Sequence, residues 1–326
     1  MNSSASPMAT ALMTLMKLKG VGRRGALKMV SPSDGELDAV AFREAISSRA
    51  RALPGASHTA LDIADAWTRS EKELDRGSKV GVRAFALHDA AYPTRLKDIP
   101  DPPAVLFAKG NTDALNAPCS IAIIGTREPT SYGMEVARRG GRTASEASFT
   151  VVSGLAHGCD TYAHEGCVEV EGVGVAVLAH GLDHVYPAAS RGLAAKLLEL
   201  NGCLASEYPF GMKPARTAFA ERDRIQSGLS DGVFVIETDV EGGTMHTVRF
   251  ARAQHRRVAC TAHPQKWLFE EKTRGNQKLI ADRWAEPIPD GQALSDFLSH
   301  IGLPSPAREA QPVADSRVEI QQSFSF

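Results

Sequence analysis

Six short apolar runs, rich in β-branched residues, lie between residues 121 and 262, and helix-length segments separate most of them. The runs are Ile121–Gly125, Thr150–Gly154, Gly174–Gly181, Cys203–Tyr208, Gly232–Thr238 and Arg257–Ala262. Short strands that alternate with helices predict a mostly parallel sheet covered on both faces. We therefore expect an α/β protein with an extended, Rossmann-like, mostly parallel sheet and helices on both faces.

The length of 326 residues suits one large domain with an appendage or two ordinary domains. We expect a small helical domain of the helix-hairpin-helix or SAM-like kind over residues 1–84, interrupted at Leu53–Ser57. A proline-dense segment, Ala91–Asn111, leads into the Rossmann-like domain, which we place at 85–290. Residues 291–326 are predicted to hold one short helix and a disordered tail.

The N-terminal region is strongly basic. Its first thirty residues carry five basic side chains and no acidic one. Within them, Gly20-Val21-Gly22 separates two helical segments, a pattern typical of a helix-hairpin-helix element whose glycines let backbone N–H groups approach a DNA phosphate. Gly20, Gly22, Arg23 and Arg24 are therefore candidate secondary DNA contacts. A simple αα-hairpin that serves only packing is the open alternative.

The overall composition argues for a soluble intracellular protein. Lys and Arg number 37 against 38 Asp and Glu, so any basic surface for nucleic acid must be local. The five cysteines form no CxxC pair and are expected to be reduced. The N-terminal apolar stretch precedes its basic residues, the reverse of a secretory signal, and no uncharged apolar run reaches the ~18 residues that span a bilayer. We expect a cytoplasmic protein with no membrane partner.

Three of the predicted strands end in glycine-bearing loops. These loops contain Gly125-Thr126-Arg127, Ser153-Gly154 and Gly243-Thr244. Ligands of open α/β sheets bind outside the carboxyl ends of the strands, and glycine-rich backbone there can cradle an anion. The alternative is that the glycines only end the strands tightly.

The segment Arg216–Ser230 places arginines around a lone aromatic residue. Arg216, Arg222 and Arg224 surround Phe219. A single-stranded nucleic acid is bound in this way, with guanidinium groups on its phosphates and a ring on which a base stacks. Phe219 as a core residue is the alternative.

Catalytic and metal-binding interpretations find less support. His157, Asp160 and His164 have a spacing that a metal could use. No third strong ligand with helical spacing follows the two histidines, and Asp160 suits the N-cap of the next helix. Ser153 lacks the G-x-S-x-G pattern of a nucleophile elbow. We therefore expect no catalytic residue, no metal and no cofactor.

In their order along the chain, these motifs resemble the DNA-processing protein A family (DprA, also called Smf). The resemblance runs through "IAIIGTREPTSYG", "VVSGLAHGCDTYAHEG", "VAVLAHGLDHVYP", "FAERDRIQSGLS" and "VFVIETDVEGGTMHT", and covers about residues 85 to 288. It implies a non-enzymatic, homodimeric protein that binds and protects single-stranded DNA and helps to load a RecA-type recombinase, as in natural transformation. It also implies an extended Rossmann fold without a nucleotide cofactor.

The resemblance also implies roles for individual residues. Gly125, Thr126 and Arg127 would hold a backbone phosphate, and Ser153 and Gly154 would line the same pocket. Arg216 would contact DNA, Phe219 would stack a base, and Arg222 and Arg224 would complete a positive rim. This chain has Asp223 where the family usually has asparagine, and Gly242-Gly243-Thr244 where the family has a Ser-Gly-Ser loop.

Two other classes of function stay open on the sequence. One is a nucleotide-ligand sensor or phosphoribohydrolase-like protein, as in a defence system, because "EGGT" resembles the glycine-rich loop of those enzymes. Here Met245-His246-Thr247 follows that loop, without the catalytic glutamate. The other is a protein-interaction module with a degenerate pocket, for which Asp223 is the best support. Transformation, defence and general recombination would leave similar pockets.

Overall fold

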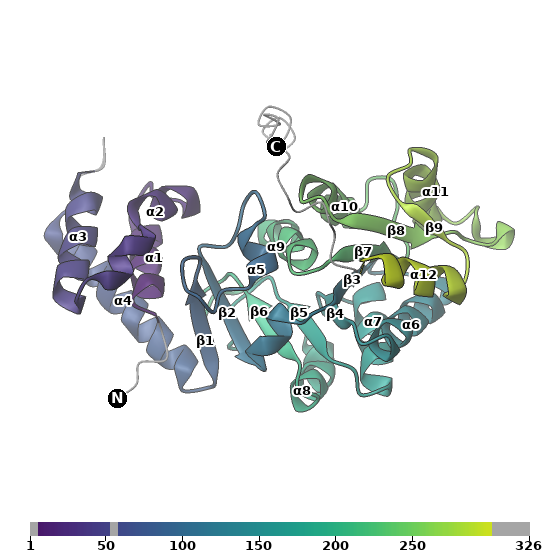
Figure 1. Ribbon diagram of the computed structural model, residues 1–326, viewed down its shortest axis with the longest axis horizontal. Helices are drawn as coiled ribbons and strands as arrows, with labels where there is room; N and C mark the ends of the chain where they lie inside the picture. Colours follow the sequence, from purple (N-terminus) through teal and green to yellow (C-terminus); the bar gives the residue numbers. More distant parts are fainter. Residues whose placement is uncertain (1–5, 53–57, 302–326) are drawn as a thin grey trace.

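The computed structural model describes residues 6–52 and 58–301, and within these ranges it contains a nine-stranded sheet. The strands are β1 (Val82–Ala86), β2 (Val105–Gly110), β3 (Ser120–Ile124), β4 (Thr150–Ser153), β5 (Gly174–Val177), β6 (Cys203–Ser206), β7 (Gly232–Val235), β8 (Arg257–Thr261) and β9 (Glu286–Ile288). Their spatial order is β1-β2-β6-β5-β4-β3-β7-β8-β9 (Figure 1). Neighbours from β6 to β9 are parallel, whereas β1–β2 and β2–β6 are antiparallel. The expected mostly parallel sheet is confirmed.

The direction of the chain reverses once within the parallel part of the sheet. From β3 it proceeds through β4 and β5 to β6 on one side, and then returns to place β7, β8 and β9 on the other side. β3 and β7 are hydrogen-bonded neighbours, so the switch point of the topology lies between their carboxyl ends. Open α/β sheets bind their ligands in the crevice at such a point.

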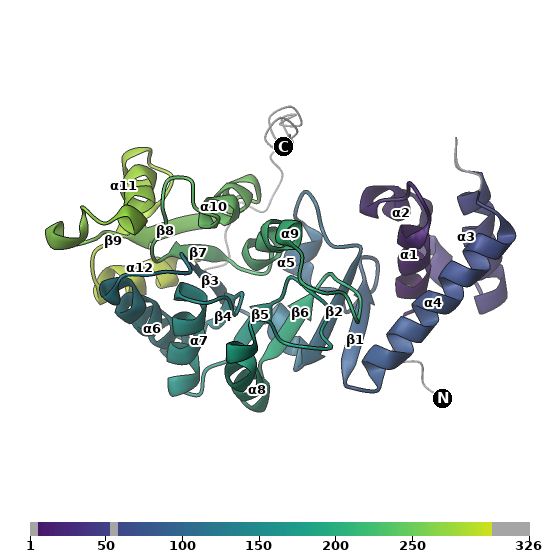
Figure 2. The same ribbon diagram turned by 180° about the vertical axis from the view of Figure 1, so that it is seen from behind.

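Helices cover both faces of the sheet (Figure 1). One face carries α6 (Ser131–Glu146), α7 (Cys159–Glu169), α8 (Arg191–Glu199) and α12 (Gly291–Ile301), and the other carries α5 (Thr94–Lys97), α9 (Arg216–Gly228), α10 (Thr244–Ala253) and α11 (Arg274–Ala281). The alternation of side chains along β3 explains this arrangement. Ile121 and Ile123 pack with α6, α7 and α12, while Ala122 and Ile124 pack with α9, α10 and α11. From behind, α9 and α10 are seen side by side (Figure 2).

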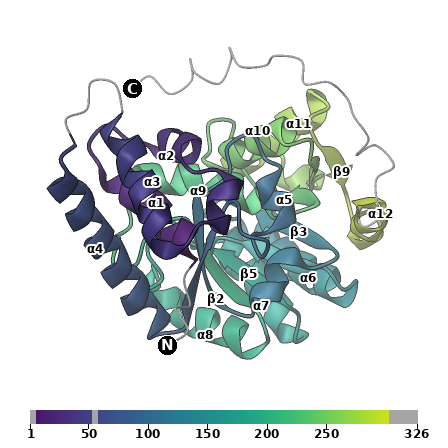
Figure 3. The same cartoon turned by 60° about the vertical axis from the view of Figure 1, so that its left-hand side comes forward.

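The N-terminal region is helical, as expected, and packs against one edge of the sheet. It consists of α1 (Pro7–Lys17), α2 (Arg23–Met29), α3 (Ala39–Arg51) and α4 (Ala60–Ser78). Leu12, Leu15 and Ile63 of these helices share one apolar core with Val105 and Phe107 of β2. Figure 3 shows the helices in front of this edge. None of the helices that the structure describes combines the length and the apolarity that a bilayer-spanning segment needs.

The structure differs from the sequence-based boundaries in a few places. β1, which we did not expect, pairs with β2 from Val82 to Ala86 and so crosses the boundary placed between residues 84 and 85. β9 is also additional, and its Pro287 is tolerated because β9 is an edge strand. The strands predicted at Gly174–Gly181, Cys203–Tyr208 and Gly232–Thr238 end two or more residues earlier than expected. Just beyond the end of β5, Leu178 N–H still donates to Ala205 O at 2.8 Å. Leu53–Ser57 and the predicted tail after Ile301 lie outside the described residues.

Candidate nucleic-acid interface

A cleft with a volume of about 540 Å³ opens at the switch point between β3 and β7. This volume is typical of a small-ligand site. The cleft is lined by the segment Ile124–Arg127 after β3, by loop residues after β7 and the start of α10, and by one face of α9. It brings together eight of the predicted site residues, namely Gly125, Thr126, Arg127, Arg216, Phe219, Arg222, Gly243 and Thr244. Ser153, Gly154 and Arg224 do not line it.

One part of the lining is cationic and aromatic, and we call its residues Arg127, Arg216 and Phe219 the rim. Asp239 and Glu241 also line the cleft. Both arginines are exposed and Phe219 is half-buried. The guanidinium carbon of Arg127 lies 4.9 Å from the centroid of the Phe219 ring, within the range of a cation–π contact. The centroid of the Tyr186 ring lies 6.2 Å from that of the Phe219 ring. Phe219 is therefore a partly exposed ring in the site and not a core residue.

The backbone of the loop that carries Arg127 is held on two sides. Thr126 N–H donates to Glu237 O at 2.8 Å, and Thr126 O accepts from Cys159 N–H at 3.1 Å. A Cβ at position 125 would lie 2.7 Å from Cys159 Cβ, so only glycine permits this approach of α7 to the loop. The sequence "GTR" is thus fixed between β7 and α7.

A carboxylate of the chain itself occupies the N-terminus of α6. Glu237, which follows β7, accepts from Thr130 N–H at 2.8 Å and from Thr130 Oγ1 at 2.6 Å. Its Oε1 also lies 3.3 Å from His263 Nε2. In dinucleotide-binding folds the pyrophosphate sits at the corresponding helix N-terminus. Here a phosphate would meet like charge, so the N-terminus of α6 does not offer the pyrophosphate site of a dinucleotide-binding fold.

The inner wall of the cleft consists of Asp160, Arg222, Asp223 and Gln226, which we call its floor. Arg222 is only 4% exposed. Its Nη1 lies 3.8 Å from Asp160 Oδ2 and its Nε 3.7 Å from Asp223 Oδ1, both beyond hydrogen-bond distance. Arg222 Nε has no hydrogen-bond partner in the part of the chain that the structure describes. Two carboxylates thus face one guanidinium, and the floor is negative when both are ionised.

Burial controls the protonation of the floor. It raises the pKa of Asp223 to about 7, against the opposing effect of the Arg222 charge, and Asp160 nearby raises that pKa further. Burial also raises the pKa of Asp160, while the Arg222 charge lowers it. Asp160 is not the N-cap that we predicted. Gly158 caps α7, and the Asp160 carboxylate accepts instead from Gly154 N–H at 3.1 Å.

The residues predicted after β4 support the floor from behind. Ser153 is fully buried, and its hydroxyl donates to Ile123 O at 2.7 Å. A Cβ at Gly154 would lie 2.5 Å from Arg222 Cζ, so this glycine leaves room for the guanidinium. The two residues therefore lie behind the site, not in its lining.

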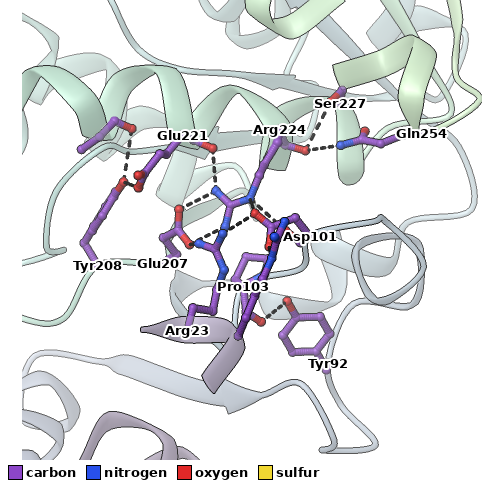
Figure 4. Close-up of polar contacts among 12 residues, drawn as sticks. Arg23, Tyr92, Asp101, Pro103, Glu207, Tyr208, Glu221, Arg224, Ser227 and Gln254 are labelled. Carbon is purple, nitrogen blue, oxygen red and sulfur yellow. Dashed lines mark hydrogen bonds and ion pairs between the residues drawn. The ribbon is translucent and has the colours of Figure 1, made fainter. Parts of the chain in front are cut away.

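Arg224 does not contribute to a positive rim. It lies two residues from Arg222, about 200° around the helix, and so on the opposite face of α9. There it is 3% exposed, and its Nη1 and Nη2 each lie 2.6 Å from an oxygen of Glu207 (Figure 4). Its Nε donates to Asp101 O at 2.9 Å. The sequence showed the arginine but not its partners.

Arg23 of α2 joins the same group. Its Nη1 donates to Glu207 at 3.0 Å, and its Nη2 contacts the Asp101 carboxylate (Figure 4). We call Arg23, Asp101, Glu207 and Arg224 the ion-pair cluster. It ties the N-terminal helices to α9, so the guanidinium of Arg23 is engaged within the chain and not offered to DNA.

The glycine hairpin before α2 is present as predicted. Gly20 has a φ of 81°, a conformation that favours glycine, and Gly22 precedes α2. The Arg24 side chain is 80% exposed and lies 3.5 Å from Asp101. A DNA contact by this hairpin stays a prediction.

The residues weighed as metal ligands do not come together. Within residues 6–52 and 58–301, no three His, Cys, Asp or Glu side chains are grouped as a metal site requires. His164 is fully buried, and burial lowers its pKa to about 3.

The fold and the cleft define a Rossmann-like α/β protein with a mixed cationic and aromatic site at its switch point. Comparison with known sequences makes the assignment specific. The chain belongs to the family described as DNA recombination-mediator protein A, whose model matches residues 83–299. This confirms the resemblance found in the sequence.

Individual relatives agree with this assignment. The chain is 36% identical over 200 residues to the DNA processing protein DprA of Bacillus subtilis. This match covers 61% of this chain and 66% of the relative. It is 39% identical over 231 residues to the protein Smf of Escherichia coli, covering 66% and 62%. The chain thus spans less than two thirds of the length of these relatives.

Solved structures give the same picture of the fold. DNA processing protein A from Helicobacter pylori, described for its single-stranded DNA binding mode, superimposes with a TM-score of 0.60 at 25% identity, over 69% of this chain and 97% of that one. DprA from Streptococcus pneumoniae superimposes with a TM-score of 0.65 at 24% identity, over 88% and 94%. Neither relative favours the nucleotide-sensor or phosphoribohydrolase alternative.

Proposed function

We propose that this protein binds single-stranded DNA in the cleft between β3 and β7, without catalysis. The observation that carries the proposal is the rim, where two exposed arginines flank a half-buried phenylalanine above a cleft large enough for a nucleotide. Such a combination holds phosphates by charge and bases by stacking, with little dependence on sequence. The single-stranded DNA binding described for the Helicobacter pylori relative supports it.

Each part of the rim has a distinct role in this proposal. Arg127 and Arg216 contact consecutive phosphates, and Phe219 stacks one base. Gly243 and Thr244 begin α10, whose N-terminus has no side-chain cap and lies on the cleft. Its N–H groups are suited to a further phosphate oxygen. Gly125 and Thr126 keep the Arg127 loop in place.

The wider role that follows from family membership is part of the proposal. A protein of this kind would protect single-stranded DNA in the cytoplasm, act as a homodimer and assist the loading of a RecA-type recombinase, in natural transformation or in general recombination. Family membership supports this role, because the family is described as a recombination mediator.

Removal of the rim charges tests the DNA site. Arg127→Ala and Arg216→Ala are each expected to lower the affinity for a 20-nucleotide dT oligomer about tenfold, because each removes a phosphate contact. The slope of log affinity against log salt should fall by about 0.7 for each. Fluorescence anisotropy titrations at several salt concentrations measure both quantities. Lys196→Ala, a loss of one exposed charge on α8, is the matched control.

The stacking part of the site responds differently to salt. Phe219→Ala should cost about 1–3 kcal/mol of binding free energy and leave the salt slope unchanged, because stacking involves no counterion release. If all three rim variants bind the oligomer as the wild type does, the cleft is not the DNA site.

The pH dependence of binding should report on Asp223. Its raised pKa of about 7 means that the floor loses a negative charge between pH 8 and pH 6, so the affinity for dT oligomer should rise as the pH falls. Asp223→Asn should bind more tightly at pH 8 and show little change in this window. A variant that keeps the wild-type pH profile would assign the change to another group, such as His246, which also lines the cleft.

Protein stability should follow the same titration. An acid whose pKa is raised in the folded state binds more protons there than in the unfolded chain. The stability of the wild type should therefore decrease from about pH 4, near the ordinary aspartate pKa of 3.8, to just above pH 7. Asp223→Asn should be the more stable protein at pH 8, and the difference should vanish in acid. Urea unfolding at several pH values measures it.

A further inference from the structure

We propose that the floor of the cleft binds the Watson–Crick edge of a guanine base, with Asp223 as the acceptor of its two adjacent N–H groups and Gln226 as a further contact. This inference rests on the proposed function, because the base would belong to the strand held at the rim. It adds a base preference to a site that is otherwise expected to be indifferent to sequence.

The first step is the division of the cleft by burial and charge. The rim arginines are exposed, whereas Arg222 and Gln226 of the floor are 4% and 1% exposed and the Asp223 side chain is 15% exposed. The floor also holds two carboxylates against one guanidinium. Phosphates therefore favour the rim, and the floor is left for a neutral group that donates hydrogen bonds.

The second step is the line of side chains along α9. Phe219, Asp223 and Gln226 are four and three residues apart, which places them on one face of the helix. All three line the cleft. Phe219 and Asp223 are separated by about 6 Å along the helix axis, close to the width of a nucleobase. A base that contacts Phe219 at the rim can therefore direct its edge towards Asp223.

The third step is that the floor has hydrogen-bonding capacity that the protein does not use. Arg222 Nε and Gln226 Nε2 are buried and have no hydrogen-bond partner among residues 6–52 and 58–301. The contact between Arg222 and Asp223 is 3.7 Å, so the guanidinium makes no hydrogen bond to the carboxylate, whose side-chain hydrogen bond is with Thr247 of α10. Buried polar groups without partners are costly, and a ligand with complementary groups would satisfy them.

The fourth step is the match to one base. A carboxylate accepts two parallel hydrogen bonds from the adjacent N1–H and N2–H of guanine, and these bonds are charge-assisted. The amide of Gln226 can donate to the neighbouring O6. Thymine offers a single N–H between two carbonyl oxygens, which repel a carboxylate. Adenine and cytosine each offer one amino group beside an acceptor nitrogen. Guanine is thus the base that the floor fits best.

The test compares oligomers that differ at one position. A dT oligomer of 20 nucleotides and the same strand with one central dG, dA, dC or deoxyinosine are titrated by fluorescence anisotropy at pH 8, where Asp223 is ionised. We expect the dG strand to bind about tenfold more tightly than the dT strand. Deoxyinosine, which lacks the 2-amino group, should lose most of this gain.

A matched variant links the preference to the floor. Asp223→Asn keeps the size of the side chain and should abolish the preference for dG while the dT strand still binds. Equal binding of the dG and dT strands by the wild type would overturn the guanine inference and leave the proposed function intact. Failure of every strand to bind would overturn the proposed function itself.

A competition experiment distinguishes binding of a DNA strand from binding of a free nucleotide that carries the same base. Micromolar dGMP should not displace the dG strand, because a mononucleotide cannot engage both rim arginines through consecutive phosphates. Displacement at that concentration would show that the floor serves a free guanine nucleotide, and it would overturn the assignment to a strand.

Discussion

Glu207→Gln is expected to lower the free energy of unfolding by about 3–5 kcal/mol, because it breaks a buried ion pair from one side. Glu207 and Arg224 side chains are 7% and 3% exposed, and two contacts of 2.6 Å join them. A neutral amide would leave the Arg224 guanidinium buried without its closest counter-charge. Urea unfolding followed by circular dichroism measures the loss.

A surface pair provides the control for this prediction. Glu199 contacts Lys196 at 3.2 Å, but its side chain is 65% exposed, so Glu199→Gln should change stability by less than about 1 kcal/mol. Arg23→Ala should have an intermediate effect, since its side chain is 24% exposed and the Glu207–Arg224 pair survives. Equal stability of Glu207→Gln and Glu199→Gln would show that the ion-pair cluster does not stabilise the fold.

Gly158→Ala is expected to cost about 3 kcal/mol or more and to weaken DNA binding as Arg127→Ala does. Gly158 has φ 82° and ψ −133°, a conformation that side chains rarely adopt. Its Cβ would also lie 2.6 Å from the carbonyl carbon and oxygen of Arg127. The new methyl group must therefore move the loop that carries Arg127, and overpacking of this kind is itself costly.

A second glycine separates the two causes. Gly81 has a φ of 80°, but no heavy atom of the described residues lies within 4 Å of a Cβ built there. Gly81→Ala should therefore cost only the conformational term, about 1–2 kcal/mol, and leave the affinity for dT oligomer unchanged. Urea unfolding and anisotropy on both variants measure the two effects. Equal losses in the two variants would mean that the contact with Arg127 is unimportant.

The sheet could be predicted from the sequence because its signal is local. A run such as Ile121–Gly125 is apolar and β-branched over a strand length and is followed by a helix, and the corresponding strand β3 differs by one residue at each end. β1 and β9 were missed because β1 (VRAFA) has only one β-branched residue and carries Arg83, and β9 is three residues long and contains a proline. Both are edge strands that pair with a single neighbour, β1 with β2 and β9 with β8.

The candidate site could be predicted only in part. The glycine loops and the segment around Phe219 were recognisable as short motifs, and the structure gathers most of them in one cleft. Helical periodicity would have separated Arg222 from Arg224, because residues two apart point in opposite directions. Nothing local indicated that Glu237 would fill the N-terminus of α6, since it lies 107 residues from Thr130.

The α/β class, the family and the residue types at the carboxyl ends of the strands follow from the order of amino acids alone. Which charges face the cleft depends on how the chain folds. Arg127 and Arg216 stay exposed, Arg222 is buried between two acids, and Arg224 is neutralised by Glu207 from another strand end. The physical reason is that charge is a property of a side chain, whereas its pKa, its partners and its access to a ligand depend on burial and on residues distant in the chain.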